Sequence, residues 1–141
     1  MKILVINGPN LNMLGIREPE IYGTTHYADL VEKLLDYAVH LEVAIEVLQT
    51  NHEGQIIDWL QQISFDGLVI NPGGYTHTSV AILDALLYCD KPKVEVHLSD
   101  ISKREAFRQT SITGRGVDHI IMGEGIAGYC RAFDYIVAAT R

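Results

Sequence analysis

The chain has 141 residues, of which 48% are hydrophobic and 21% charged, proportions typical of a globular domain that folds in water. This length favours one domain, spanning residues 1–141, with a sizeable core. A formal net charge of −7 argues against nucleic acid or an anionic membrane as a general partner, and no apolar stretch is long enough to span a bilayer. We therefore expect a cytoplasmic protein in which Cys89 and Cys130 are buried free thiols.

Strand and helix patterns alternate along the chain. Short apolar runs rich in β-branched residues predict strands, and apolar positions that repeat every three or four residues predict helices. In chain order the predicted elements are strand 2–7, helix 30–39, strand 42–49, helix 56–63, strand 66–71, helix 80–87, strand 93–98, helix 102–109, strand 118–123 and helix 126–137. The helix at 102–109 is predicted because Ser102 and Glu105 have the spacing of a capping box.

This alternation predicts an α/β fold. Short connections between parallel strands require right-handed crossovers, which place helices on both faces of the sheet in a three-layer sandwich. Five strands in a chain of this size favour the flavodoxin-like strand order 2-1-3-4-5. Ligands of such sheets bind beyond the carboxyl ends of the strands, near the point where the strand order reverses. The residues that follow each strand are therefore the candidates for a site.

Most of the polar chemistry of the sequence follows the predicted strands. The segments after the strands contain Asn7–Asn10, Thr50–His52, Asn71–His77, His97–Ser99 and Gly123–Gly125. Taken singly, Asn-Gly-Pro and Asn-Pro-Gly-Gly are ordinary turn sequences. Their collection at one edge of the sheet, while the strand starts supply little beyond charge, points to one functional edge.

Glu95 and His97 form the sharpest pair in this set. They lie two residues apart on a predicted strand, so both side chains point to the same face of the sheet. A carboxylate beside an imidazole can orient the ring for acid–base work. Arg104 and Arg108 lie four apart on the next predicted helix, where they form either a solvated face or a clamp for an anion or a polyol.

A metal site is the competing interpretation of four of these residues. His52, His77, Glu95 and His97 are residue types that bind metals, but they come from three different connections and lack a metal-ligand spacing. We therefore expect no metal at these residues. A phosphate loop and the acidic pair of a receiver domain are also missing, which argues against a nucleotide-binding or receiver module.

The connection after the first predicted strand is long and rich in functional groups. NGPNLNMLGIREPEIYG, at 7–23, combines flexible Asn, Gly and Pro residues with Arg17 and Tyr22. An arginine beside a tyrosine hydroxyl favours the phenolate, which could act as a base. The segment is therefore either a plain strand-to-helix connection or a lid over a site.

Four segments in fixed order closely resemble the type II 3-dehydroquinate dehydratases. They are residues 7–23, QTNHEGQIIDWL at 49–60, DGLVINPGGYTHTSVAILDAL at 66–86 and VEVHLSDISKREAFR at 94–108, and the likeness resumes at GEGIAGY. The resemblance implies a flavodoxin-like hydro-lyase that uses neither metal nor cofactor and assembles as trimers packed into dodecamers. Its implied reaction is anti elimination of water from 3-dehydroquinate to 3-dehydroshikimate through an enolate, in the shikimate pathway of aromatic amino acid biosynthesis or in quinate catabolism.

The resemblance also implies five catalytic residues. Tyr22 corresponds to the base that removes the C2 proton, and Arg17 to the residue that favours its phenolate. Asn10 would hold the water that stabilises the enolate oxygen. His97 would protonate the departing C1 hydroxyl and would be oriented by Glu95. In this interpretation residues 7–23 form a lid that closes over bound substrate.

Further residues correspond to positions that bind substrate in the family. Asn71 and the backbone amides of Leu98 and Ser99 would bind the substrate carboxylate, and the ring hydroxyls would meet His77 and Arg108. Asp84 would reach a neighbouring subunit's site, and Arg104 would take part in lid closure.

Residues 112–119, ITGRGVDH, depart from the family's small and apolar pattern. We expect this departure to affect the packing around the last strand and the contacts between subunits, and to affect the reaction less. The alternative function is a catalytically silent relative that acts as a binding or assembly module. Such a relative should have lost at least one of the expected polar residues, and all of them are present.

Overall fold

Five parallel strands form one sheet in the order β2-β1-β3-β4-β5, in a computed structural model that describes residues 1–16, 20 and 25–141. The strands are β1 (Lys2–Asn7), β2 (Ala44–Gln49), β3 (Gly67–Asn71), β4 (Lys93–His97) and β5 (His119–Met122). Each strand lies within its predicted range, and the strand order is the flavodoxin-like order expected from the sequence. The predicted fold class is therefore confirmed.

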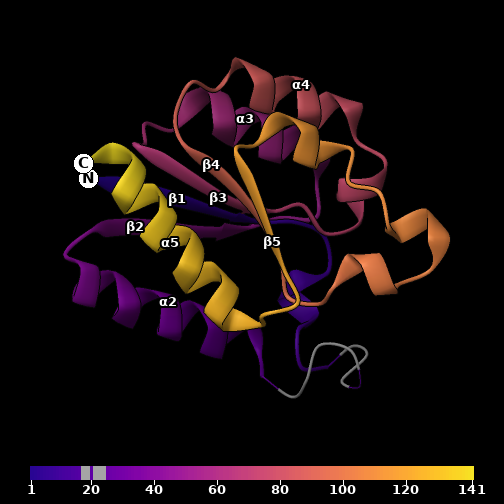
Figure 1. Cartoon of the computed structure of the whole chain (residues 1–141), viewed down its shortest axis with the longest axis horizontal. Coiled ribbons are helices and arrows are strands. Elements are labelled where there is room, and N and C mark those ends of the chain that lie inside the picture. Colours follow the sequence, from indigo (N-terminus) through magenta and orange to yellow (C-terminus); the bar gives the residue numbers. More distant parts are fainter. Residues whose placement is uncertain (17–19, 21–24) are drawn as a thin grey trace.

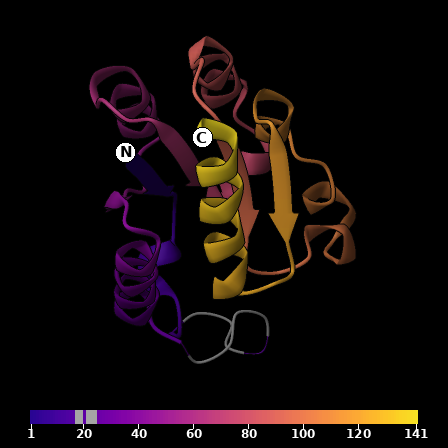
Figure 2. The same ribbon diagram turned by 60° about the vertical axis from the view of Figure 1, so that its left-hand side comes forward.

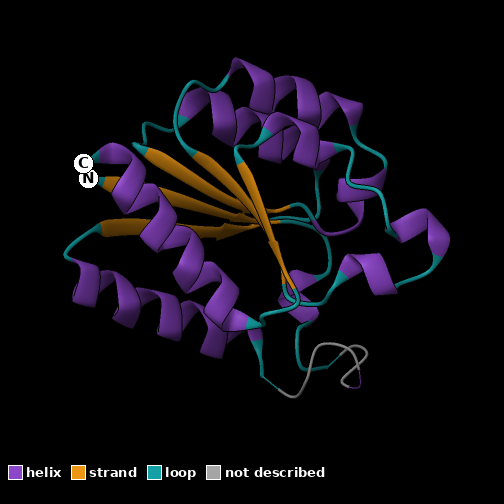
Figure 3. Cartoon of the chain, in the orientation of Figure 1, coloured by secondary structure: helices purple, strands orange, loops and turns teal. Residues whose placement is uncertain are grey.

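Two helices cover each face of the sheet (Figure 1). On one face lie α2 (Tyr27–Leu41) and α5 (Ile126–Thr140), and on the other lie α3 (Glu53–Gln62) and α4 (Val80–Tyr88). Figure 3 shows the strands between these two layers, and Figure 2 shows α5 lying along the sheet. Short 3-10 helices occupy three connections: η1 (Leu11–Met13), η2 (Gly73–His77) and η5 (Thr113–Gly116). None of the helices that the structure describes combines the length and the apolar character needed to cross a membrane.

The alternation of side chains along β1 divides the core into two halves. Ile3 and Val5 belong to the half that contains α2 and α5, and Leu4 and Ile6 belong to the half that contains α3. All four side chains have no exposed surface. A strand that is buried on both faces must be apolar at every position, which accounts for the continuous apolar run at the start of the sequence.

The outer elements are less buried than their sequences predict. β2 lies at the edge of the sheet, and its residues are half-buried or exposed. On α4 the buried side chains include Ile82 and Leu86, whereas Val80 and Leu87 of the predicted apolar stripe are 56% and 62% exposed. Because α4 is apolar around most of its circumference, the spacing of apolar residues could not identify which side faces the sheet.

The predicted helix at 102–109 is wrong. The chain forms two short 3-10 turns there, η3 (Ile101–Lys103) and η4 (Ala106–Arg108). The carboxylate of Asp100 accepts the backbone N–H of Ser102 at 3.0 Å, and Glu105 binds an arginine three residues further on. The capping box does not form, because Ser102 and Glu105 each have a competing local partner.

Ser79 joins the two helices on the α3–α4 face. It is the N-cap residue of α4 and is 2% exposed. Its hydroxyl accepts the N–H of Ile82 at 2.9 Å and donates to Glu53 at the start of α3 at 2.6 Å. His52 occupies the same position before α3, yet its side chain makes no capping hydrogen bond.

We expect Ser79→Ala to lower the free energy of unfolding by about 1–2 kcal/mol, because it removes the cap of α4 and the hydroxyl partner of Glu53. His52→Ala is the matched control and should change stability by less than about 0.5 kcal/mol. Urea unfolding followed by circular dichroism measures both values, and equal losses for the two variants would contradict the assignment.

Candidate active site

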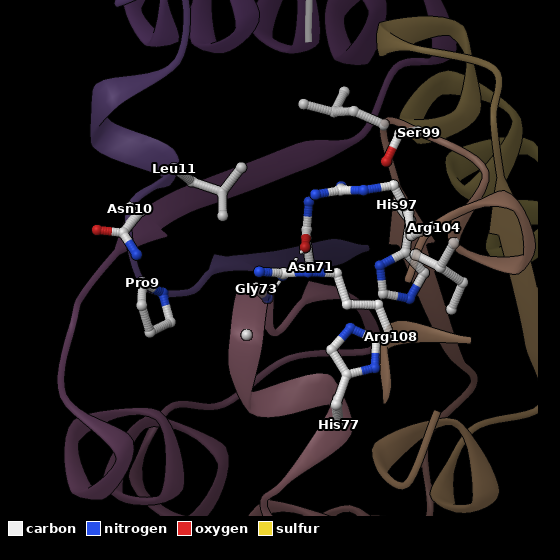
Figure 4. Close-up of a pocket in the computed structure, with 13 residues that line it drawn as sticks. Pro9, Asn10, Leu11, Asn71, Gly73, His77, His97, Ser99, Arg104 and Arg108 are labelled. Carbon is white, nitrogen blue, oxygen red and sulfur yellow. Dashed lines mark hydrogen bonds between the residues drawn. The ribbon is translucent and has the colours of Figure 1, made fainter. Parts of the chain in front are cut away.

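The carboxyl ends of β1, β3 and β4 border a pocket. Asn7 and Asn71 end β1 and β3 opposite one another in register, and His97 ends the neighbouring β4. The pocket has a volume of ≈ 210 Å³ and is partly open to solvent. Figure 4 shows Asn71 near its centre, with Pro9, Asn10 and Leu11 on one side and His77, His97, Ser99, Arg104 and Arg108 around the other.

The loops after β1 and β3 meet backbone to backbone beside this pocket. The N–H of Gly8 donates to the carbonyl of Asn71 at 2.8 Å. Gly73 has a φ of 61°, and a Cβ atom there would lie 2.8 Å from the carbonyl oxygen of Pro9. Glycine at position 73 is therefore required by this close approach as well as by its backbone angle.

Asn10 forms the wall contributed by the first loop. Its backbone is left-handed, with a φ of 69°, a conformation that Asn adopts more readily than most residues. Its N–H donates to the side-chain oxygen of Asn51 at 3.1 Å, and Gln49 donates to the same oxygen at 3.1 Å. The last residue of β2 and the segment after it thus hold the loop after β1 in place.

Glu95 and His97 point to the same face of β4, as their spacing predicts. Nε2 of His97 lies 2.8 Å from Oε2 of Glu95, which has no exposed surface. An ionised carboxylate only accepts hydrogen bonds, so Nε2 carries the hydrogen of this contact. Nδ1 is therefore the ring nitrogen of His97 that remains for chemistry in the pocket.

Two hydroxyl groups complete the surroundings of Glu95. Ser111 donates to Oε2 at 2.6 Å, and Thr113 donates to Oε1 in a short contact. Ser111 also accepts the N–H of Gly114 at 2.8 Å, which directs its own hydrogen toward Glu95. Burial alone would raise the pKa of Glu95, but the hydrogen bond and charge of His97 and the two hydroxyl donors hold that pKa below its ordinary value. Glu95 is therefore ionised.

Basic side chains give the pocket the means to bind an oxygen-rich ligand. His77 lines it with Nδ1 placed 2.9 Å from the carbonyl of Thr110. Arg104 and Arg108 also line it, although the helix predicted to carry them is absent. Nε of Arg108 binds Glu105 at 2.5 Å, which orients its guanidinium. In a chain of net charge −7, this cluster would attract an anionic group locally.

Most of the predicted site residues meet in this one pocket. Those that line it are Asn10, Asn71, His77, His97, Leu98, Ser99, Arg104 and Arg108. Asp84 does not line it, because the side of α4 that carries Asp84 faces solvent. Arg17 and Tyr22 lie outside the described residues. Across the described ranges, no group of three His, Cys, Asp or Glu side chains is arranged to hold a metal ion.

Sequence reasoning missed Ser111 and Thr113. They lie 16 and 18 residues beyond Glu95, and no periodicity links them to β4. The available signal was indirect: a buried carboxylate needs donors, and these hydroxyls follow the last pocket arginine closely. Only the path of the chain in space shows that they are the donors.

Comparisons with known proteins agree with one another. The chain matches the family described as dehydroquinase class II over residues 1–137. The 3-dehydroquinate dehydratase of Thermotoga petrophila is 53% identical over 136 residues, 96% of this chain and 94% of the relative. The type II dehydroquinase from Butyrivibrio crossotus superposes with a TM-score of 0.95 at 48% identity, covering 97% of both chains. That from Propionibacterium acnes gives 0.93 at 42% identity, covering 97% of this chain and 96% of the other.

We expect Glu95→Gln to reduce stability more at neutral pH than in acid. Because folding lowers the pKa of Glu95 below its ordinary 4.5, its ionised form stabilises the protein above that pH, and this contribution is lost as the pH falls through the folded value. The substitution should lower the free energy of unfolding by about 1–3 kcal/mol near pH 7 and by less near pH 3.5. Urea unfolding at both pH values measures this difference, and Glu105→Gln, at an exposed glutamate, is the control. A decrease in the free energy of unfolding that does not depend on pH would contradict the prediction.

Proposed function

Because the chain belongs to the class II dehydroquinase family, we propose that it is a 3-dehydroquinate dehydratase, which removes water from 3-dehydroquinate to give 3-dehydroshikimate through an enolate. The single observation that carries this proposal is the buried Glu95–His97 pair at the edge of a pocket that also contains Asn71 and Arg108. A positioned acid beside donors for a carboxylate and hydroxyls is what such an elimination requires.

In this proposal His97 is the general acid. The Glu95 carboxylate holds Nε2, so the imidazolium can deliver the hydrogen on Nδ1 to the departing C1 hydroxyl. Glu95 also stabilises the positive charge of the ring before transfer. The acid therefore needs no rearrangement when the carbon–oxygen bond breaks.

The remaining pocket residues are proposed to hold the substrate. Asn71 and the backbone amides of Leu98 and Ser99 supply neutral donors for its carboxylate, and His77 and Arg108 are available to its ring hydroxyls. These residues end β3, follow β4 or belong to the turns beyond. A ligand spanning them would be fixed in orientation relative to His97.

The base is assigned from family resemblance. Tyr22, with its phenolate favoured by Arg17, would remove the C2 proton, and Asn10 would hold a water against the enolate oxygen. Of these three, Asn10 belongs to the described residues and lines the same pocket as His97. Arg104, also in the lining, would act in lid closure over the substrate. The reaction would serve the shikimate pathway or quinate catabolism in the cytoplasm.

We further propose a homo-oligomer, a dodecamer built as four trimers. Its support is an apolar stripe on the outer side of α4, where Val80, Leu87 and Tyr88 are 56%, 62% and 90% exposed. Large exposed apolar side chains that gather on one side of a helix mark an interaction site. Asp84 lies on the same side of the helix, which would let it reach a neighbouring subunit's pocket.

The direct test is ultraviolet absorbance after the purified protein is mixed with 3-dehydroquinate. We expect a conjugated-enone band to grow at a rate that a chelator does not change. His97→Gln should lower kcat at least about 100-fold, because it removes the general acid. His40→Gln, an exposed histidine of α2, is the control and should leave kcat unchanged.

A flat trace from folded wild-type protein would overturn the proposed function and favour the catalytically silent relative. A normal kcat for His97→Gln with active wild type would instead reject only the assignment of the acid.

The assembly has its own test. Light scattering coupled to size exclusion should give a mass of about twelve chains for the wild type and a smaller species for Leu87→Glu, because a carboxylate cannot be buried in an apolar contact without cost. Val39→Glu changes an apolar residue on α2 that is more exposed than Leu87, at 77%, and should leave the mass unchanged. A monomeric wild type would contradict the proposal.

A further inference from the structure

A line of four hydrogen-bonded side chains runs beneath the pocket on the α2–α5 side of the sheet. Asn71 donates from Nδ2 to the hydroxyl of Tyr129 at 3.1 Å, and Tyr129 donates to Oδ1 of Asn7 at 2.6 Å. Asn7 in turn donates from Nδ2 to the hydroxyl of Tyr27, the first residue of α2, at 3.4 Å. The line therefore connects α2, β1, α5 and β3, and it ends at a residue that lines the pocket.

The direction of every hydrogen bond in this line follows from one backbone group. The N–H of Gly73 can only donate, and it lies 3.1 Å from Oδ1 of Asn71. The Nδ2 side of Asn71 must therefore face Tyr129, whose hydroxyl accepts from it. Tyr129 then has its single hydrogen left for Asn7, at the shorter distance of 2.6 Å.

The reversed orientation of Asn71 is excluded by the same partners. It would turn Nδ2 toward the N–H of Gly73, so that two donors faced each other. It would also take the hydrogen of Tyr129 away from Asn7, whose oxygen is completely buried. Unpaired polar groups in such a place are costly, so the amide has one stable orientation.

Tyr129 is suited to this task because it does not titrate near neutral pH. It has no exposed surface, and burial raises the pKa of its hydroxyl far above the ordinary value despite the opposing hydrogen bond from Asn71. Its ring packs in the core between α5 and the sheet. The hydroxyl is therefore a permanent donor to Asn7 and a permanent acceptor from Asn71.

We propose that Tyr129 is a positioning residue that locks the Asn71 amide with a free N–H toward the pocket, so that this part of the pocket accepts an oxygen acceptor of the ligand, such as a carboxylate. One hydrogen on Nδ2 is used by Tyr129, and the described residues offer no acceptor to the second. The inference rests on the proposed function only for the identity of the ligand.

Tyr129→Phe tests the proposal by removing one hydroxyl and keeping the ring. We expect the KM for 3-dehydroquinate to rise about tenfold while kcat stays within about twofold, because the substrate carboxylate keeps its charge throughout the elimination, so that its contact with Asn71 is equally strong in substrate and transition state. Tyr37→Phe is the matched control: its hydroxyl donates to Asp134 at 2.7 Å, away from the pocket, and its loss should change neither constant.

A double-mutant cycle separates positioning from general packing. If Tyr129 acts through Asn71, then Tyr129→Phe should change KM by less than about twofold in an Asn71→Ala background. A full tenfold rise in that background, or no rise in the wild-type background, would overturn the proposal. Asn7→Ala, which removes the acceptor of the Tyr129 hydrogen, should also raise KM and provides a second reading if Tyr129→Phe does not fold.

A measurement without turnover distinguishes failure of this inference from failure of the proposed function. The side-chain NH₂ signal of Asn71 in nitrogen-15 spectra, identified by its loss in Asn71→Ala, should shift and exchange faster in Tyr129→Phe but not in Tyr37→Phe. An unchanged signal would overturn the inference. This result stands even if the wild type proves inactive on 3-dehydroquinate, which would reject the proposed function alone.

Discussion

Glu95 has no exposed surface, so the protein itself must supply the interactions that water would give an ionised carboxylate. Much of the architecture around the pocket follows from this requirement. His97 supplies one donor from the same strand, and the other two come from residues 111–113, which must therefore run beside β4. That path is fixed in turn by a backbone hydrogen bond of 2.8 Å from Ile112 to Thr76 in η2. The burial of one charge thus ties together β4, the segment before β5 and the turn after β3.

The pocket depends on both faces of the sheet. Side chains alternate along a strand, so Asn71 points with Val69 toward α5, whereas His97 points with Glu95 toward the α3–α4 side. Two separate polar networks hold the ends of these neighbouring strands, one beneath each face. An acid and an amide only one strand apart can thereby be oriented by different partners. Rigid support of this kind on strands suits a site whose groups must be held in fixed geometry.

The features that could be predicted from the sequence are those that depend on the spacing of residues along a strand or helix and on the order of the elements. Alternating patterns led to the five parallel strands, and the spacing of Glu95 and His97 led to their common face. The sequence could not predict what depends on local competition or on the path of the chain. The helix expected to begin at Ser102 does not form, because the N–H of Ser102 donates to Asp100 instead. The outward side of α4 could not be predicted, because α4 is apolar around most of its circumference. The hydrogen bonds of Tyr129 were equally inaccessible, since its apolar spacing on α5 indicates a core residue and nothing about its hydroxyl.

Residues 112–119, which we expected to affect the packing around the last strand, contribute directly to the surroundings of Glu95. Thr113 is completely buried and donates to Glu95, a task that an apolar side chain could not perform. The N–H of Gly114 donates to the hydroxyl of Ser111. A Cβ atom on residue 114 would lie 2.7 Å from that hydroxyl oxygen and 2.5 Å from the side chain of Ile120. A hydroxyl followed by a glycine is thus the combination that lets this segment approach a buried carboxylate closely and satisfy it. Part of the composition of residues 112–119 is thus explained by the buried charge of Glu95 and by the close approach of this segment to it.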